Sequence, residues 1–358
     1  MFISHPNRSY SRDDAVSIRY TSVMQQIRGV NLGGWLVLER WITPELFEGC
    51  EAQDEYGLCI WSPEEAKRRL VKHRETFITR ETIRQVRDMG LNTVRLPIGY
   101  WLFDEVSPFI KGANDYVDSL FSWCEELGIG VILDIHAAQG SQNGWDHSGR
   151  SGRIGWGSAE TVLETLKFLE AVLDRYGRKK ALRALEVLNE PHWDVPIHTL
   201  VAYYEQAYQR IRQYRPDLTV VMSDAFRPEE MSKQLAKRHF EDVLLDVHLY
   251  QLFTDEDRAL DLDGHVRKAQ REWSTLLQKL TKRMPVLVGE WSAAMHELYL
   301  PIDQPRHTAG YTTDDYVMYF RTQRQVFEST GAGWTYWTAK TSQGGPWSLL
   351  DNPQFLNE

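Results

Sequence analysis

Short apolar or β-branched runs alternate with longer amphipathic stretches along most of the chain. The short runs have the length and composition of buried strands, and they lie at residues 26–31, 92–96, 130–136, 185–189, 218–223, 243–248, 285–290 and 333–338. Between them, apolar residues recur at helical spacing at residues 79–89, 116–127, 159–176, 199–214, 266–280 and 315–327. The pattern therefore predicts eight strands that alternate with helices.

This order of elements favours an α/β fold of the (β/α)8 TIM-barrel type. Gly90, Gly128 and Gly177 directly follow three of the predicted helices, as C-terminal caps do. No Gly-rich phosphate-binding turn follows the first strand, which argues against a doubly wound sheet. No linker rich in Gly, Ser or Pro divides the chain, so we expect one catalytic domain over residues 1–358, with the barrel at approximately 26–347.

Composition narrows the class of partner. With 42% hydrophobic and 25% charged residues, the chain resembles ordinary soluble globular proteins. Its 41 Lys and Arg against 50 Asp and Glu give a net charge of −9, which disfavours nucleic acid and anionic membranes as partners. The 13 Trp, 16 Tyr and 13 Phe exceed what a core needs, and flat rings also stack on the faces of sugars.

Cysteine usage and the first residues bear on redox chemistry and compartment. Of the three cysteines, only Cys50 and Cys59 are close enough in sequence for a local bridge, and we expect reduced thiols. Residues 1–26 contain no apolar run of the kind a signal peptide requires. A cytoplasmic location is expected for the sequence as written, and an extracellular or periplasmic one if a leader was removed. No His-x-x-x-His or Cys-x-x-Cys spacing predicts a metal site, and we expect no cofactor.

The strongest chemical signal is a pair of glutamates at predicted strand ends, where the active site of such a barrel lies. Glu190 ends the fourth strand in Leu-Asn-Glu-Pro, and Glu290 ends the seventh in Val-Gly-Glu-Trp. Either alone could be a solvated strand-end carboxylate. Together they face each other across the barrel mouth as in a glycosidase, where a separation of about 5 to 5.5 Å implies retention of configuration.

Neighbouring residues separate the roles of the two glutamates. Asn189 precedes Glu190 and could bind a substrate hydroxyl beside the reacting centre. Tyr250 leaves the sixth strand next to Glu290, and its phenol would hold that carboxylate ionised. Arg95 would also lower the pKa of Glu290, unless it is paired only for packing. Glu190 has no obvious cation beside it, and we expect it to have the raised pKa.

Eight ordered blocks extend this assignment. They read NLGGWLVLERWITPELF (31–47), GLNTVRLPIGYW (90–101), DIHAAQGSQNGWDHSG (134–149), LNEP (188–191), SDAF (223–226), HLYQLF (248–253), VGEWSAA (288–294) and YWTAKT (336–341). Over residues 27–347 the chain thereby resembles glycoside hydrolase family 5, and most closely its exo-β-1,3-glucanase branch from yeasts and other fungi.

The resemblance implies a role for each matching residue. Glu190 would be the acid/base and Glu290 the nucleophile. Glu39 and Asp146 would hold hydroxyls of the non-reducing end, and Trp145 and Phe253 would clamp the next sugar at the entrance, where family members carry two phenylalanines. The residues expected around the sugar being cut are Arg95, His136, Asn189, His248, Tyr250 and Trp337, and Phe226 of the SDAF block is counted with the substrate-binding residues.

Departures from the fungal pattern lie at the rim. Residues 137–139 read Ala-Ala-Gln where fungal members have Gly-Ala-Pro, Ala339 stands where they have Trp, and an Arg common in them near residues 309–311 is missing. His147 and His192 could touch substrate, but exposed loop histidines are the expected interpretation.

We therefore expect a retaining exo-acting β-glucanase or β-glucosidase that cleaves β-1,3 bonds of a β-glucan or β-glucoside oligosaccharide from its non-reducing end. Long loops at residues 41–62 and 140–157 would wall a closed pocket. The alternatives are an endo-β-1,4-glucanase or mannanase, a lipid or aryl β-glucosidase, and an inactive sugar-binding barrel. Linkage preference, aglycone and oligomeric state stay open.

Overall fold

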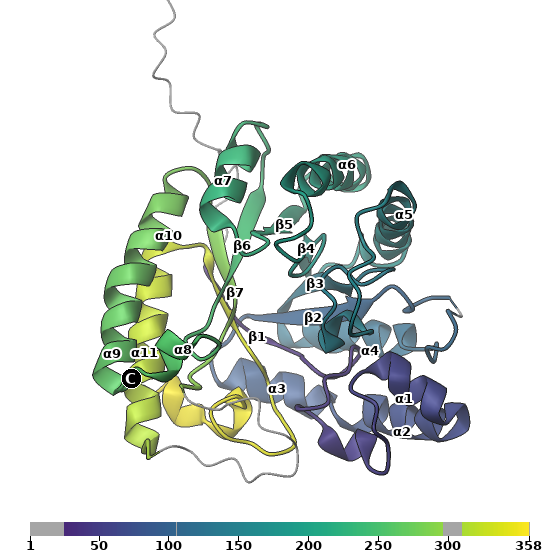
Figure 1. Ribbon diagram of the computed structural model, residues 1–358, viewed down its shortest axis with the longest axis horizontal. Helices are drawn as coiled ribbons and strands as arrows, with labels where there is room; N and C mark the ends of the chain where they lie inside the picture. Colours follow the sequence, from purple (N-terminus) through teal and green to yellow (C-terminus); the bar gives the residue numbers. More distant parts are fainter. Residues whose placement is uncertain (1–24, 105, 296–309, 358) are drawn as a thin grey trace, which may run out of the picture.

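The computed structural model describes residues 25–104, 106–295 and 310–357, which form a closed barrel of parallel strands surrounded by helices (Figure 1). Each strand pairs with its neighbour in sequence, and β1 closes the barrel on β8, with Ile27 opposite Gly333. The strands are β1 (Ile27–Asn31), β2 (Thr93–Gly99), β3 (Gly130–Ala137), β4 (Leu182–Glu186), β5 (Thr219–Ser223), β6 (Val243–Leu249), β7 (Val286–Trp291) and β8 (Gly333–Tyr336). The predicted (β/α)8 fold class is confirmed.

Helices occupy every stretch in which helical spacing was found. They are α1 (Glu55–Trp61), α2 (Pro63–Thr76), α3 (Arg80–Asp88), α4 (Asn114–Leu127), α5 (Ala159–Tyr176), α6 (Ile197–Tyr214), α7 (Pro228–Ala236), α8 (Asp255–Arg258), α9 (Leu262–Lys268), α10 (Ser274–Thr281) and α11 (Thr313–Thr330). A π-helical turn, Ala269–Trp273, joins α9 to α10. Helices α1, α2, α7 and α8 were not predicted, because they are short or carry few apolar residues.

The predicted boundaries of the fourth strand are wrong by three residues at its start. β4 begins at Leu182, and its ladder ends at Glu186, although Val187 and Leu188 remain fully buried. One further hydrogen bond joins this segment to β3: the backbone N–H of Asn189 donates to the carbonyl of Ile135 at 2.9 Å. The apolar residues therefore continue beyond the last residue of β4 that pairs with a neighbouring strand, and the predicted strand was placed too far along the chain.

The glycine caps differ in their reason for being glycine. Gly128 caps α4 with a φ of 71°, and Gly90 follows the end of α3 with a φ of 79°, so both use the left-handed region. Gly177 after α5 instead has a φ of −56°. A Cβ atom there would lie 2.5 Å from the Leu173 carbonyl oxygen and 3.0 Å from the Tyr214 ring, so close packing requires the glycine.

Side chains that point into the barrel change character from bottom to top. An apolar layer at the bottom contains Ile27, Ile132, Ala184, Val221, Leu244 and Leu287. Two residues further along their strands, Asp134, Glu186 and Asp246 are also fully buried or nearly so. One more step of two brings His136 and His248 to the carboxyl ends of β3 and β6. The alternation of a strand thus delivers buried charge and then polar groups to the barrel mouth.

The state of the cysteines was predicted from the sequence. Cys50, Cys59 and Cys124 are all free and buried, which confirms reduced thiols. Within residues 25–104, 106–295 and 310–357, no helix is long and apolar enough to cross a membrane.

Candidate active site

Glu190 and Glu290 meet at the mouth of the barrel. One carboxylate oxygen of each, together with a ring nitrogen of His248, forms a group whose atoms all lie within 4.8 Å of one another. Glu290 is part of β7, whereas Glu190 lies beyond β4 with a φ of 42°, a backbone conformation that non-glycine residues rarely adopt. This spacing suits a retaining pair, since an inverting pair needs about 6.5 to 9.5 Å to admit a water molecule.

Glu290 is held by two donors. The Tyr250 hydroxyl donates to its Oε2 at 3.0 Å, as the sequence predicted, and Arg95 Nη1 donates to its Oε1 at 3.0 Å. The carboxylate is therefore fixed from both sides. Its exposed fraction is only 5%, so these bonds form largely away from solvent.

Arg95 lies beneath the site and is completely buried. Every nitrogen of its guanidinium has a protein partner. Its hydrogen bonds go to Glu186 (Nε, 2.7 Å), Asn31 (Nη1, 2.9 Å), Glu290 (Nη1, 3.0 Å) and Asn189 (Nη2, 2.8 Å), and Nη2 forms an ion pair with Asp134 at 3.1 Å. Arg95 thus holds Glu290 and Asn189 in position, and its direct contact with a substrate remains a prediction.

We expect this cation to be indispensable for folding stability. Replacing it in Arg95→Met would leave Asp134, Glu186 and Glu290 buried without their cation, and breaking a buried network of this kind costs about 3 to 5 kcal/mol of unfolding free energy. Urea denaturation would measure the loss. Arg95→Lys should recover part of the stability, but it should stay impaired in activity because lysine lacks the planar fork.

Arg210→Met is the matched control, because Arg210 pairs with Glu170 at the protein surface. Such exposed pairs contribute at most about 1 kcal/mol. An Arg95→Met protein as stable as wild type would show that the buried carboxyls are neutral and need no cation.

His248 reverses the expected electrostatics of the two glutamates. Its Nδ1 lies 2.6 Å from Glu190 Oε1 and 3.5 Å from Glu290 Oε2, and its Nε2 lies 3.3 Å from Asp246 Oδ2. Burial disfavours a charged imidazole, but Glu290, Asp246 and Glu190 together raise the pKa of His248 well above its usual value. His248 is thus a cation shared by three carboxyl groups.

The pKa order of the pair follows from this cation. Burial would raise the pKa of Glu190, but the charge and hydrogen bond of His248 lower it to about 2. Burial raises the pKa of Glu290 to about 8, and the charge of Glu190 contributes in the same direction. The expectation of a raised pKa at Glu190 and a lowered one at Glu290 is therefore wrong for this structure. Arg95 divides its charge among several carboxylates, so it does not keep the pKa of Glu290 low.

Two further side chains offer free polar atoms to the site. His136 Nδ1 lies 2.6 Å from Asp134 Oδ2, and burial lowers its pKa well below the usual value, so its ring is neutral. Its Nε2 and the Asn189 amide nitrogen are buried without a hydrogen-bond partner among the described residues. The Trp337 ring stacks on His136 at 5.5 Å with an angle of 8° between the planes. The site thus presents one donor, the Asn189 amide, and one acceptor, His136 Nε2, beside the flat ring of Trp337.

The two acids expected at the non-reducing end lie near each other. Glu39 follows β1 and accepts a hydrogen bond from Trp41 Nε1 at 2.7 Å, and Asp146 begins a 3₁₀ turn, Asp146–Ser148, after β3. Burial and the neighbouring charge of Asp146 raise the pKa of Glu39 well above its usual value. Burial also raises the pKa of Asp146. The charges of Glu290 and Glu190 also raise the pKa of Glu39, so Glu39 lies within reach of the catalytic pair.

Trp145 and Phe253 reach the catalytic pair from different sides. The Trp145 ring lies 5.5 Å from that of His147, whose Nε2 is 3.4 Å from Glu190 Oε2. The Phe253 ring lies 5.3 Å from that of Tyr250, the donor to Glu290, and its side chain is 54% exposed. Phe226 packs edge-on against Trp145 at 5.5 Å. All three rings are therefore available at the rim.

Two histidines near the catalytic pair are less exposed than predicted, and two tryptophans near it were not predicted. His147 and His192 were expected to be exposed loop histidines, but their side chains are only 15% and 12% exposed, and His147 contacts Glu190. Trp193 and Trp347 were not proposed for the site. Trp347 lies 5.0 Å from the Trp41 ring and 5.8 Å from that of Tyr250. Their loop positions carry no periodic signal, so sequence alone could not place them.

In the part of the chain that the structure describes, two groups of side chains have the atoms that a metal ion would need. They are Glu186, Asp246 and His248, and Glu190, His248 and Glu290. His248 belongs to both, and its two ring nitrogens face carboxylates of Glu190 and Asp246, while Glu186 accepts from Arg95. These contacts form an ion-pair network around His248, whereas the other oxygen of Glu186, Oε1, is buried without a hydrogen-bond partner among the described residues. That the protein uses no metal or cofactor remains a prediction.

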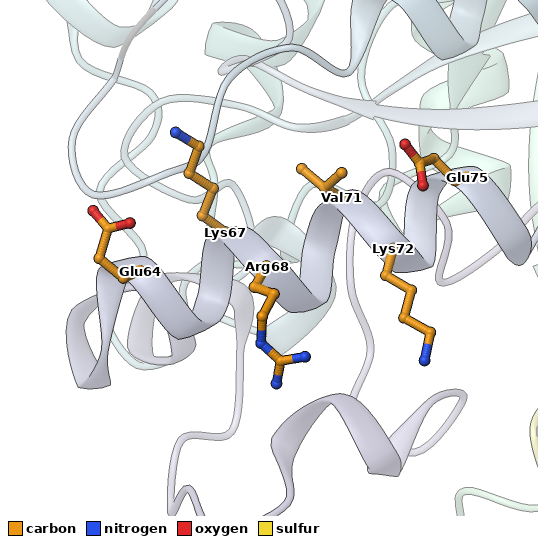
Figure 2. Close-up of a pocket in the computed structure, with 6 residues that line it drawn as sticks. All are labelled: Glu64, Lys67, Arg68, Val71, Lys72 and Glu75. Atoms are coloured by element: carbon orange, nitrogen blue, oxygen red, sulfur yellow. The ribbon is translucent and has the colours of Figure 1, made fainter.

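A shallow hollow of about 350 Å³ lies elsewhere, on the outer face of α2 (Figure 2). The side chains that line it, Glu64, Lys67, Arg68, Val71, Lys72 and Glu75, follow this one helix. Mixed charges at helical spacing are typical of a solvated helix surface. This hollow is therefore no part of the site at the barrel mouth.

A (β/α)8 barrel whose mouth holds one glutamate just beyond β4 and another at the end of β7 has the architecture of a glycoside hydrolase. The sequence profile described as Cellulase (glycosyl hydrolase family 5) matches residues 62–343. The chain belongs to this family.

Curated relatives support the assignment. A protein of Aspergillus fumigatus named "Probable glucan 1,3-beta-glucosidase A" is 34% identical, covering 97% of this chain and 89% of the relative. A protein of Emericella nidulans with the same name is also 34% identical, covering 94% and 91%. Among solved structures, a rutinosidase from Aspergillus niger has a TM-score of 0.77 at 21% identity, covering 97% of this chain and all of that one, which shows the shared fold.

Proposed function

We propose that this protein is a retaining exo-β-glucosidase that releases glucose from the non-reducing end of β-1,3-linked glucans or oligosaccharides. One observation carries the proposal: Glu190 and Glu290 have carboxylate oxygens within 4.8 Å of each other across the barrel mouth, with His248 between them. The β-1,3 linkage is supported by the names of the fungal relatives.

In the proposed reaction, Glu290 attacks the anomeric carbon while Glu190 gives its proton to the glycosidic oxygen. The bond between that carbon and that oxygen breaks, the shortened glucan leaves as an alcohol, and glucose stays attached to Glu290 through an ester bond. Water then attacks the same carbon, Glu190 takes its proton, and β-glucose is released. Tyr250 and Arg95 hold Glu290 in place for both steps.

The reactive form requires the proton on Glu190 and the negative charge on Glu290. The pKa values of the structure favour the opposite distribution. Moving one proton from Glu290 to Glu190 interconverts the two forms without changing the total charge. His248 Nδ1 faces both carboxyl groups, so it is the group through which this proton moves.

The remaining residues recognise the sugar. The unpaired Asn189 amide nitrogen and His136 Nε2 bind hydroxyls of the glucose unit that is released. This glucose unit stacks on the ring of Trp337. Glu39 and Asp146 close the pocket around the non-reducing end. Trp145 and Phe253 clamp the first sugar of the leaving chain from the two sides of the catalytic pair.

The test is product analysis on laminarin, cellooligosaccharides and aryl β-glucosides in parallel. We expect laminarin to yield glucose without intermediate oligosaccharides, and an NMR time course to show β-glucose before the α-anomer. A ladder of oligosaccharides would indicate an endo-acting enzyme instead. Initial α-glucose would exclude the retaining mechanism.

A further inference from the structure

An aromatic cluster extends beyond Glu190 along the loops that follow β3, β4 and β5. It consists of Trp145, Trp193 and Phe226. The Trp145 ring lies 6.1 Å from that of Trp193 and 5.5 Å from that of Phe226, and the Trp193 and Phe226 rings are 5.8 Å apart. The mechanism described above uses only Trp145 of these rings.

Trp193 is both exposed and held in place. Its exposed fraction is 51%, which is large for an indole. The His192 ring lies 3.9 Å from the Trp193 ring and is itself fixed, because its Nδ1 accepts the Asp194 N–H at 3.1 Å. The backbone N–H of His192 donates to the backbone carbonyl of Gln142 at 3.0 Å. One side of the indole is therefore supported by protein, while half of its surface is open.

The cluster lies on the side of the leaving group. Because Glu190 gives its proton to the glycosidic oxygen, the departing chain must begin next to Glu190. Trp193 is the third residue after Glu190, and Trp145 contacts His147, which faces the same carboxylate. If Trp145 takes the first departing sugar, then Trp193 and Phe226 are placed for the next one.

We propose that Trp193, with Phe226, forms a second leaving-group subsite that binds the apolar face of a second glucosyl unit beyond the bond that is cleaved. This inference rests on the proposed function. Flat aromatic side chains suit the task because they offer a large apolar face with few rotatable bonds. The Asp194 side chain is 72% exposed beside the indole and supplies an acceptor for hydroxyls at the edge of a sugar, which an aryl group would not use.

Chain length provides the test. Laminaribiose fills only the glucose site and the first leaving-group subsite, whereas laminaritriose also reaches the second. We expect Trp193→Ala to lower kcat/KM for laminaritriose about fivefold, the size of one aromatic contact, and to change kcat/KM for laminaribiose less than about twofold. Trp193→Phe should keep most of the preference for the longer substrate, whereas Trp193→Leu, apolar but not flat, should lose it.

Leu163→Ala is the matched control, because Leu163 is 47% exposed on α5 and should change neither substrate. Melting curves of the variants should match wild type. An equal loss on both substrates would overturn the second subsite while the proposed function stands. A loss on 4-methylumbelliferyl β-glucoside without one on laminaritriose would assign Trp193 to an aryl aglycone and overturn the sugar subsite. If wild type hydrolyses neither oligosaccharide, the proposed function itself fails.

Discussion

Glu290→Gln should lose on the order of 10⁴-fold or more in kcat on laminarioligosaccharides and on aryl β-glucosides alike, because no covalent intermediate can form without the carboxylate. The substitution keeps the shape of the side chain: the amide oxygen can accept from Arg95, and the amide NH2 can donate to the Tyr250 hydroxyl oxygen. The melting temperature should therefore stay close to that of wild type. A residual activity above about 1% of kcat would show that Glu290 is not the nucleophile.

A small anion identifies the face that Glu290 attacks. In Glu290→Ala, azide fits where the carboxylate was and should attack an activated β-glucoside from that side, giving the α-glucosyl azide and the free phenol. Glu229→Ala is the control, since Glu229 lies on the outer helix α7 and should behave as wild type. Formation of the β-glucosyl azide by Glu290→Ala would place the nucleophile elsewhere.

Sequence alone predicted that Glu190 and Glu290 meet at the barrel mouth, because the geometry of a barrel is simple. Side chains of a strand alternate, and parallel strands all end at one face, so Glu190 and Glu290 had to meet wherever eight strands close. The hydrogen bond from Tyr250 to Glu290 follows from the same rule, because Tyr250 leaves the neighbouring strand β6. The meeting of these side chains could therefore be predicted even though the boundaries of β4 were not.

Two kinds of prediction failed. One kind depends on the conformation of a loop, and the other depends on a charge that is shared among several groups. Whether His147 faces solvent or Glu190 is decided by the path of residues 140–157, which has no periodic pattern. The pKa order failed for a related reason. It depends on the 2.6 Å contact between His248 and Glu190 and on the division of the Arg95 charge among several acceptors, and neither can be read from spacing along the chain.

The acid is identified by how its loss depends on the leaving group. Glu190→Ala should lose about 10²- to 10⁴-fold in kcat/KM on laminaribiose, whose departing alcohol needs a proton, but much less on 2,4-dinitrophenyl β-glucoside, whose phenolate departs without one. Azide should accelerate the second step of this variant and yield the β-glucosyl azide, opposite in configuration to the product of Glu290→Ala.

His248→Gln separates the acid from the group that we expect to supply its proton. It leaves Glu190 in place but removes the cation that lowers the Glu190 pKa, so the pKa of Glu190 should rise and the pH profile of kcat/KM should change. The selective loss on poor leaving groups should be far smaller than in Glu190→Ala. Equal losses on both substrates in Glu190→Ala would mean that Glu190 is not the acid, and that His248 or His147 donates the proton instead.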